Sequence, residues 1–97
     1  MSQGQQAAWE EYQKALEAAR EKLGKVRQTL ENEYQKAVVD VRAKYMKPGM
    51  PVPEEYEKEM LAAQDKYYKA MMAARDEYDK AYQAAWDKYQ RVLQATK

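Results

Sequence analysis

An eleven-residue spacing of large apolar side chains runs along the whole chain. Tyrosine recurs at intervals of eleven or twenty-two residues, and Leu23 fills the one gap. The tyrosines of this column are Tyr12, Tyr34, Tyr45, Tyr56, Tyr67, Tyr78 and Tyr89. Eleven residues complete about three turns of an α-helix, so this spacing keeps the column on one helical face. The pattern therefore predicts helices, and we label its positions a to k with tyrosine at a.

Smaller apolar residues accompany the tyrosines at positions d, e and h. Two of the units read Tyr34, Ala37, Val38, Val41 and Tyr67, Ala70, Met71, Ala74. On a helix these four positions share one face with the tyrosine. The sequence thus predicts an apolar stripe that packs against a second helix.

Charged residues occupy the opposite face and largely neutralise one another. Position c carries lysine or arginine, and position j, four residues earlier, is mostly acidic, as in Asp65 and Lys69. Acid-before-base pairs at this spacing contribute about 0.3–0.5 kcal/mol each, so we expect a solvated face of ion pairs. With 17 basic and 16 acidic residues the net charge is +1, and a nucleic-acid partner is not expected.

Three prolines in six residues interrupt the helical pattern. Pro48, Pro51 and Pro53 cannot lie inside a helix, and Pro53 followed by two glutamates is a typical helix start. We predict helix 1 over residues 3–46, a turn over residues 47–52 and helix 2 over residues 53–95, in a single domain of residues 1–97. The predicted fold class is all-α: a long antiparallel helical hairpin built on eleven-residue repeats.

A lone pair of helices has no enclosed core, and small chains of this kind need a partner or a covalent staple. The chain has no cysteine for a disulfide, and its second helix carries Leu61 and Met72 at position f, away from the main stripe. We therefore expect a homo-oligomer, dimeric or larger, in the form of a helical bundle or array. The predicted interface consists of Trp9, Tyr12, Tyr34, Tyr45, Tyr56, Met60, Leu61, Tyr67, Met71, Met72, Tyr78, Tyr82, Trp86 and Tyr89.

Two tryptophans, Trp9 and Trp86, both occupy position i beside the stripe. In an antiparallel hairpin that turns near residue 50 they come close together, at the end away from the turn. There they either close the open end of the hairpin or anchor a neighbouring subunit or partner.

The residues for most enzyme chemistry are missing. The chain contains no histidine and no cysteine, and its single serine is Ser2. Helical di-iron sites need Glu-x-x-His motifs, and three scattered glycines form no phosphate-binding loop. We expect no catalytic residues, no metal, no cofactor and no enzyme activity.

Structural self-assembly, as a subunit of a filament, shell, virion or scaffold, is the function that these features favour. One alternative follows from a resemblance: the proline-punctuated eleven- and twenty-two-residue repeats resemble those of exchangeable apolipoproteins, which implies binding to a lipid surface. Another alternative is a helical adaptor or inhibitor that presents one face to a protein partner. Separately, Pro48-Gly49-Met50-Pro51 resembles the Pro-x-x-Pro turn of type III secretion needle proteins, a resemblance that implies assembly into helical tubes.

The sequence shows no signal peptide and no apolar run of the roughly 18 residues that a transmembrane helix needs. A cytoplasmic location, non-classical export and virion association all remain compatible with it.

Overall fold

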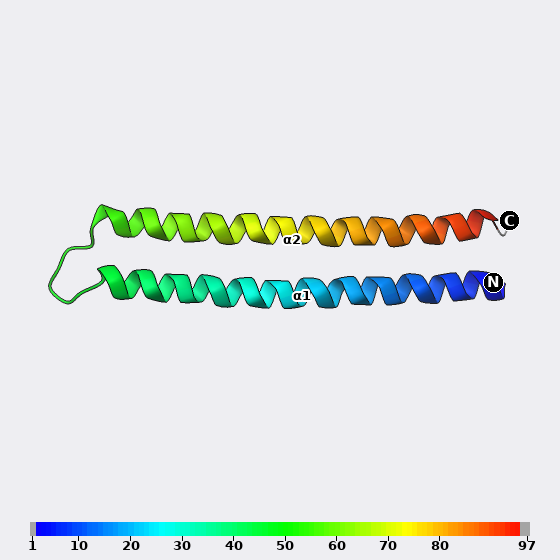
Figure 1. Ribbon diagram of the computed structural model, residues 1–97, viewed down its shortest axis with the longest axis horizontal. Helices are drawn as coiled ribbons and strands as arrows, with labels where there is room; N and C mark the ends of the chain where they lie inside the picture. Colours follow the sequence, from blue (N-terminus) through cyan, green and yellow to red (C-terminus); the bar gives the residue numbers. More distant parts are fainter. Residues whose placement is uncertain (1, 96–97) are drawn as a thin grey trace. The chain divides into compact units, whose positions relative to one another are not determined.

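Two α-helices make up nearly all of the computed structural model, which describes residues 2–95 (Figure 1). Helix α1 spans Gln3–Tyr45 and helix α2 spans Glu54–Ala95. No strand occurs within those residues. The predicted all-α helical hairpin is confirmed. At the turn, α1 ends one residue earlier and α2 begins one residue later than predicted.

The N-terminus of α1 is closed by a reciprocal pair of hydrogen bonds. The Gln5 backbone N–H donates to Ser2 Oγ, and the Ser2 backbone N–H donates to Gln5 Oε1, each at 3.2 Å. This is the capping box, in which two helix-end groups are satisfied at once. It explains why the helix starts at Gln3 although no acidic residue lies in its first turn.

A β-turn over residues 47–50 follows α1. The Met50 N–H donates to the Lys47 carbonyl at 3.2 Å, and Gly49 has a φ of +79°. Proline at the second position and a glycine of positive φ at the third define a type II turn. Pro48 disfavours the helical conformation for the residue before it, Lys47. Helix α1 therefore cannot extend to Lys47.

Helix α2 begins just after Pro53, whose carbonyl accepts a hydrogen bond from the Tyr56 N–H at 3.1 Å. Pro53 therefore lies at the cap of α2, one residue before the first helical position. The first turn carries Glu54, Glu55 and Glu57, which complement the positive end of the helix dipole.

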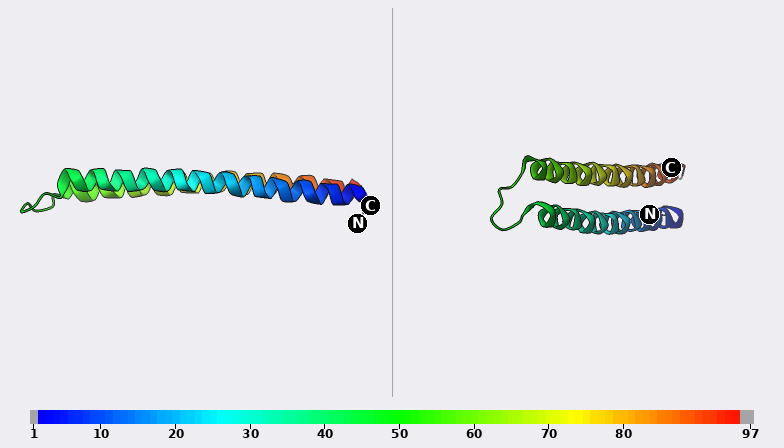
Figure 2. Two further views of the ribbon diagram at one scale, coloured as in Figure 1. Left: turned by 90° about the horizontal axis from the view of Figure 1, so that it is seen from below. Right: turned by 60° about the vertical axis from the view of Figure 1, so that its left-hand side comes forward.

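Contacts between the helices fall into two compact units. The first unit contains residues 2–25 of α1 and residues 74–95 of α2. The second unit contains residues 26–73, including the turn. In each unit a segment of α1 lies beside a segment of α2 of opposite direction, as the three views show (Figures 1 and 2).

The buried side chains of residues 2–95 lie in the first unit. They are Ala8, Tyr12, Leu16 and Tyr89, and the half-buried Ala85, Val92 and Leu93 pack against them. In the second unit the facing residues, such as Tyr34 and Tyr67, are half-buried. The first unit is thus the better packed of the two.

Two glycines are expected to respond to alanine substitution with opposite signs. Gly24 lies inside α1 with no atom within 4 Å of an added Cβ, so Gly24→Ala should stabilise the protein by about 1 kcal/mol through helix propensity. Gly49→Ala should destabilise it by about 1 kcal/mol, because its positive φ is strained for alanine. Urea unfolding of both variants at one protein concentration measures this. A stabilising Gly49→Ala would contradict the type II turn.

Candidate functional site

In the first unit, aromatic residues from both helices form one cluster. Tyr12 and Tyr89 stack with ring centroids 5.4 Å apart and planes 25° from parallel. Trp9 contacts both tyrosines at 5.6 and 5.5 Å, and Trp86 contacts both at 5.7 and 6.0 Å. Tyr82 adds an edge contact to Tyr12 at 6.4 Å. Such ring pairs contribute about 0.5–1.5 kcal/mol each beyond area burial, so this cluster holds the unit together.

The two tryptophans cover the tyrosine pair and still face solvent. Trp9 is 37% exposed and Trp86 is 39% exposed, whereas Tyr12 and Tyr89 beneath them are 6% and 7% exposed. A hydrogen bond with the Tyr82 side chain, followed by burial, raises the pKa of Tyr12. The cluster therefore closes this part of the hairpin and leaves aromatic surface on its outside.

In the second unit the same column of tyrosines pairs across the helices. Tyr34 and Tyr67 have ring centroids 5.0 Å apart, and Tyr45 and Tyr56 have centroids 6.3 Å apart in an edge-to-face arrangement. In these two pairs, as in the Tyr12 pair of the first unit, the residue numbers add to 101. In both units, position a of α1 therefore faces position a of α2.

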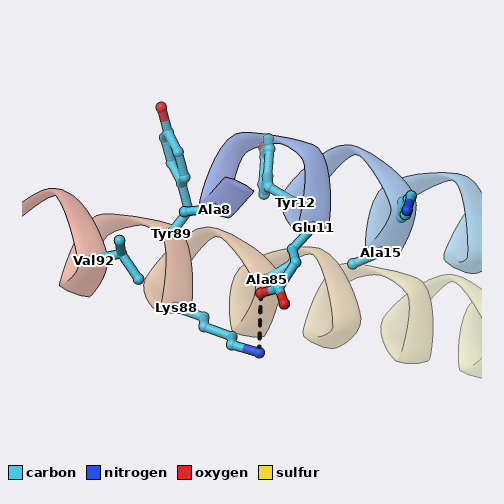
Figure 3. A pocket seen from close by; sticks show the side chains of 9 residues that line it. Ala8, Glu11, Tyr12, Ala15, Ala85, Lys88, Tyr89 and Val92 are labelled. Carbon is cyan, nitrogen blue, oxygen red and sulfur yellow. Dashed lines mark ion pairs between the residues drawn. The ribbon is translucent and has the colours of Figure 1, made fainter. Parts of the chain in front are cut away.

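A groove of about 250 Å³ lies on one side of the tyrosine pair of the first unit (Figure 3). Its lining consists of Ala8, Glu11, Tyr12, Lys14, Ala15, Ala85, Lys88, Tyr89 and Val92. Figure 3 shows the Tyr12 and Tyr89 rings standing side by side, with the Glu11–Lys88 ion pair spanning the two helices. The alanines leave the space that the groove occupies.

A second groove, of about 90 Å³, is lined in the second unit by the corresponding positions of the repeat. With the exception of Lys14, moving each α1 residue of the first groove forward by twenty-two and each α2 residue back by twenty-two gives the lining of the second groove. That lining is Leu30, Glu33, Tyr34, Ala37, Ala63, Lys66, Tyr67 and Ala70. Leu30 stands where the first groove has Ala8, and Ala70 stands where it has Val92.

Position k of the repeat carries glutamate and lysine in alternation: Glu11, Lys22, Glu33, Lys44, Glu55, Lys66, Glu77 and Lys88. This alternation has a structural reason. Lys88 and Glu11 form an ion pair at 3.5 Å across the helices of the first unit. Because k of α1 faces k of α2, an alternation of sign along the chain sets opposite charges against each other. Both side chains are about 70% exposed, so this pair is worth little in energy and acts mainly on register.

Next to the turn, Lys44 pairs with Glu59 at 3.2 Å, one helical turn beyond the k position at Glu55. Lys44 also lies 5.1 Å from the centre of the Tyr45 ring. A hydrogen bond with the Tyr45 side chain lowers the pKa of Glu59; burial opposes this shift, and the contact with Lys44 lowers the pKa further. Tyr45 and Glu59 in turn raise the pKa of Lys44. Both shifts favour the charged pair.

Three apolar side chains, which we call the outer stripe, project from α2 in the second unit. Leu61 is 62% exposed, Tyr68 is 64% exposed and Met72 is 45% exposed. At 3.6 residues per turn they fall within an arc of about 40°, well around the helix from the inward-facing Tyr67. An exposed apolar row of this kind on a helix marks an interaction surface.

The predicted interface residues separate into three groups by exposure. Tyr12 and Tyr89 are buried within the first unit, and Trp9, Leu61, Met72, Tyr82 and Trp86 are exposed. The half-buried residues are Tyr34, Tyr45, Tyr56, Met60, Tyr67, Met71 and Tyr78. The prediction omitted Tyr68, which lies outside the eleven-residue column. Its spacing from Leu61 and Met72, seven and four residues, could have identified it.

The fold and this site define a class, that of two-helix hairpins whose facing surfaces are tyrosine and alanine. No family model, curated protein or solved structure matches the chain. Within residues 2–95, neither helix is long and apolar enough to span a membrane. In the same range, no three acidic side chains gather closely enough to hold a metal ion.

Proposed function

We propose that this chain is a structural subunit that assembles with copies of itself through helix–helix packing. The observation that carries the proposal is its exposed area of 7741 Å². A compact monomer of 11.4 kDa exposes about 5,800 Å². The difference, about 2,000 Å², is more than twice the roughly 800 Å² that each partner contributes to a standard interface.

Large apolar side chains contribute to this surface. Ten large hydrophobic side chains of residues 2–95 are exposed, among them Trp9, Trp86 and Leu61, whereas four side chains are buried. Removing apolar surface from water contributes about 25 cal/mol per Å², so covering these side chains is the main favourable contribution still available to the fold. Area enough for more than one interface supports a bundle or array.

Binding to a lipid surface has less support. In both units the tyrosine and alanine faces of the two helices pack against each other, as the Tyr12–Tyr89 and Tyr34–Tyr67 pairs show. A lipid surface would have to separate them. Asp65 also lies beside the outer stripe, where a carboxylate opposes insertion among lipid chains.

Sedimentation velocity from about 1 μM to about 500 μM, the range over which interfaces of modest area associate, tests the proposal. We expect the sedimentation coefficient to rise with protein concentration. Negative-stain microscopy of the most concentrated samples then distinguishes closed oligomers from filaments. A single monomeric species throughout would overturn the proposal. Co-flotation of such a monomer with vesicles would favour the lipid-surface alternative.

A further inference from the structure

We propose that the outer stripe of α2 packs against the outer stripe of a second copy, with the two α2 helices running antiparallel. This proposal rests on the proposed self-assembly and identifies one surface that carries it. The stripe lies wholly within the second unit.

The outer stripe is an apolar face without cover from its own chain. Leu61 and Tyr68 are 62% and 64% exposed, although α2 packs against α1 through other residues of the same turns, such as Tyr67. Half-buried Met60 and Met71 lie next to Leu61 and Met72 along the chain. The middle of α2 is therefore apolar on two sides, as expected for a helix with two helical neighbours.

The spacing of the outer stripe taken together with the neighbouring Asp65 matches itself when reversed. Leu61, Asp65, Tyr68 and Met72 are separated by four, three and four residues. A two-fold axis between residues 66 and 67 therefore sets Leu61 against Met72 of the second copy. The same axis sets Asp65 against Tyr68 of the second copy, so a phenolic O–H faces a carboxylate oxygen twice, once on each side of the axis.

Charge decides the direction of the second helix. We call the contact between the two outer stripes the seam. In a parallel pair each residue faces the same residue of the second copy, which would bring two Asp65 carboxylates together at the seam. In the antiparallel pair, Lys69 of the second copy comes within one residue of the level of Asp65. Within one chain Lys69 already lies 2.9 Å from Asp65, so the seam joins two such ion pairs into a group of four alternating charges. Antiparallel helix dipoles add to this preference.

Self-complementarity is also what favours a second copy over a different partner. An unrelated apolar helix would cover the Asp65–Lys69 ion pair with apolar surface, and burying an ion pair is costly unless further hydrogen bonds satisfy it. The second copy supplies Tyr68 and Lys69 to the same carboxylate.

The seam is short, and its strength follows from that. From Leu61 to Met72 it extends about 16 Å, at 1.5 Å per residue. A contact of this length buries less than the roughly 1,200 Å² total of stable complexes. It acts as one of several contacts in an assembly whose other surfaces lie elsewhere on the chain.

Disulfide trapping tests the seam directly, because the chain contains no cysteine of its own. Three full-length variants are made: Leu61→Cys, Met72→Cys and, as control, Gln35→Cys, which is exposed on α1 of the same unit. Each is incubated alone and in pairwise mixtures with oxidised glutathione, and the rate of dimer formation is followed on non-reducing gels. Sedimentation velocity of the reduced proteins is recorded in parallel.

We expect the mixture of Leu61→Cys with Met72→Cys to cross-link at least about tenfold faster than either variant alone or any mixture with Gln35→Cys, because apposition raises the effective thiol concentration. Two Leu61 positions in the seam lie about 16 Å apart along the axis, beyond the reach of a disulfide.

Rapid cross-linking of each variant with itself would overturn the antiparallel arrangement. Cross-linking no faster than the control, from proteins that still associate, would overturn the seam and leave self-assembly intact. A reduced protein that is monomeric at every concentration would overturn both proposals.

Discussion

Tyr12→Ala is expected to lower the free energy of unfolding by about 3–5 kcal/mol, the range for removing a large buried aromatic side chain. Tyr12 is 6% exposed and has ring contacts with Trp9, Tyr82, Trp86 and Tyr89, so it lies at the centre of the aromatic cluster. Urea unfolding followed by far-UV circular dichroism measures the loss. Protein concentration is held constant, since association also changes apparent stability.

Two matched variants show whether packing of the ring is the cause. Tyr12→Phe keeps the ring and removes the hydroxyl, and it should cost much less than Tyr12→Ala. Tyr34→Ala makes the same change at the corresponding position of the second unit, where the side chain is half-buried and pairs with Tyr67. If Tyr34→Ala cost as much as Tyr12→Ala, the contrast in packing between the two units would be wrong.

The double variant Leu61→Lys with Met72→Lys is expected to weaken self-association at least about 100-fold, or about 2.8 kcal/mol at 1.4 kcal/mol per tenfold. In the antiparallel seam Leu61 faces Met72 of the second copy, so each lost apolar contact becomes a pair of facing ammonium groups. Lysine is a good helix former, so α2 should stay helical. Sedimentation equilibrium gives the association constant, and circular dichroism checks helicity.

A control variant adds the same charge elsewhere in the second unit. Gln35→Lys with Val39→Lys replaces two exposed residues on α1, of which Val39 is a 62% exposed hydrophobic side chain. This control should change the association constant by less than about tenfold, because its added charges change only the non-specific electrostatic repulsion between chains. Equal weakening by both double variants would contradict a specific role of the outer stripe.

The sequence was sufficient to predict both helices and the turn, because proline placement and apolar spacing act locally. The tyrosine column was predicted to face inward, and three of its pairs contact one another across the helices. These pairs also explain the length of the turn. Tyr45 and Tyr56 face each other on either side of it, so the eleven-residue step between them keeps position a of α1 opposite position a of α2.

Contacts that depend on both helices were harder to predict. Lys44 bonds Glu59 instead of Glu55, because a lysine side chain reaches a full helical turn along its neighbour. The difference in burial between the two units also depends on pairs of residues. The positions of Trp9 and Trp86, moved by twenty-two residues toward the turn, are occupied in the second unit by Glu31 and Gln64. The tyrosines of the second unit therefore lack an aromatic cover.

The mass of the unmodified chain at sedimentation equilibrium is the most direct test of self-assembly. One chain has a mass of 11.4 kDa. We predict an apparent mass that rises above this value as concentration increases, and that fits a defined oligomer or open growth. A mass that stayed at 11.4 kDa up to about 500 μM, where even weak interfaces associate, would contradict the account.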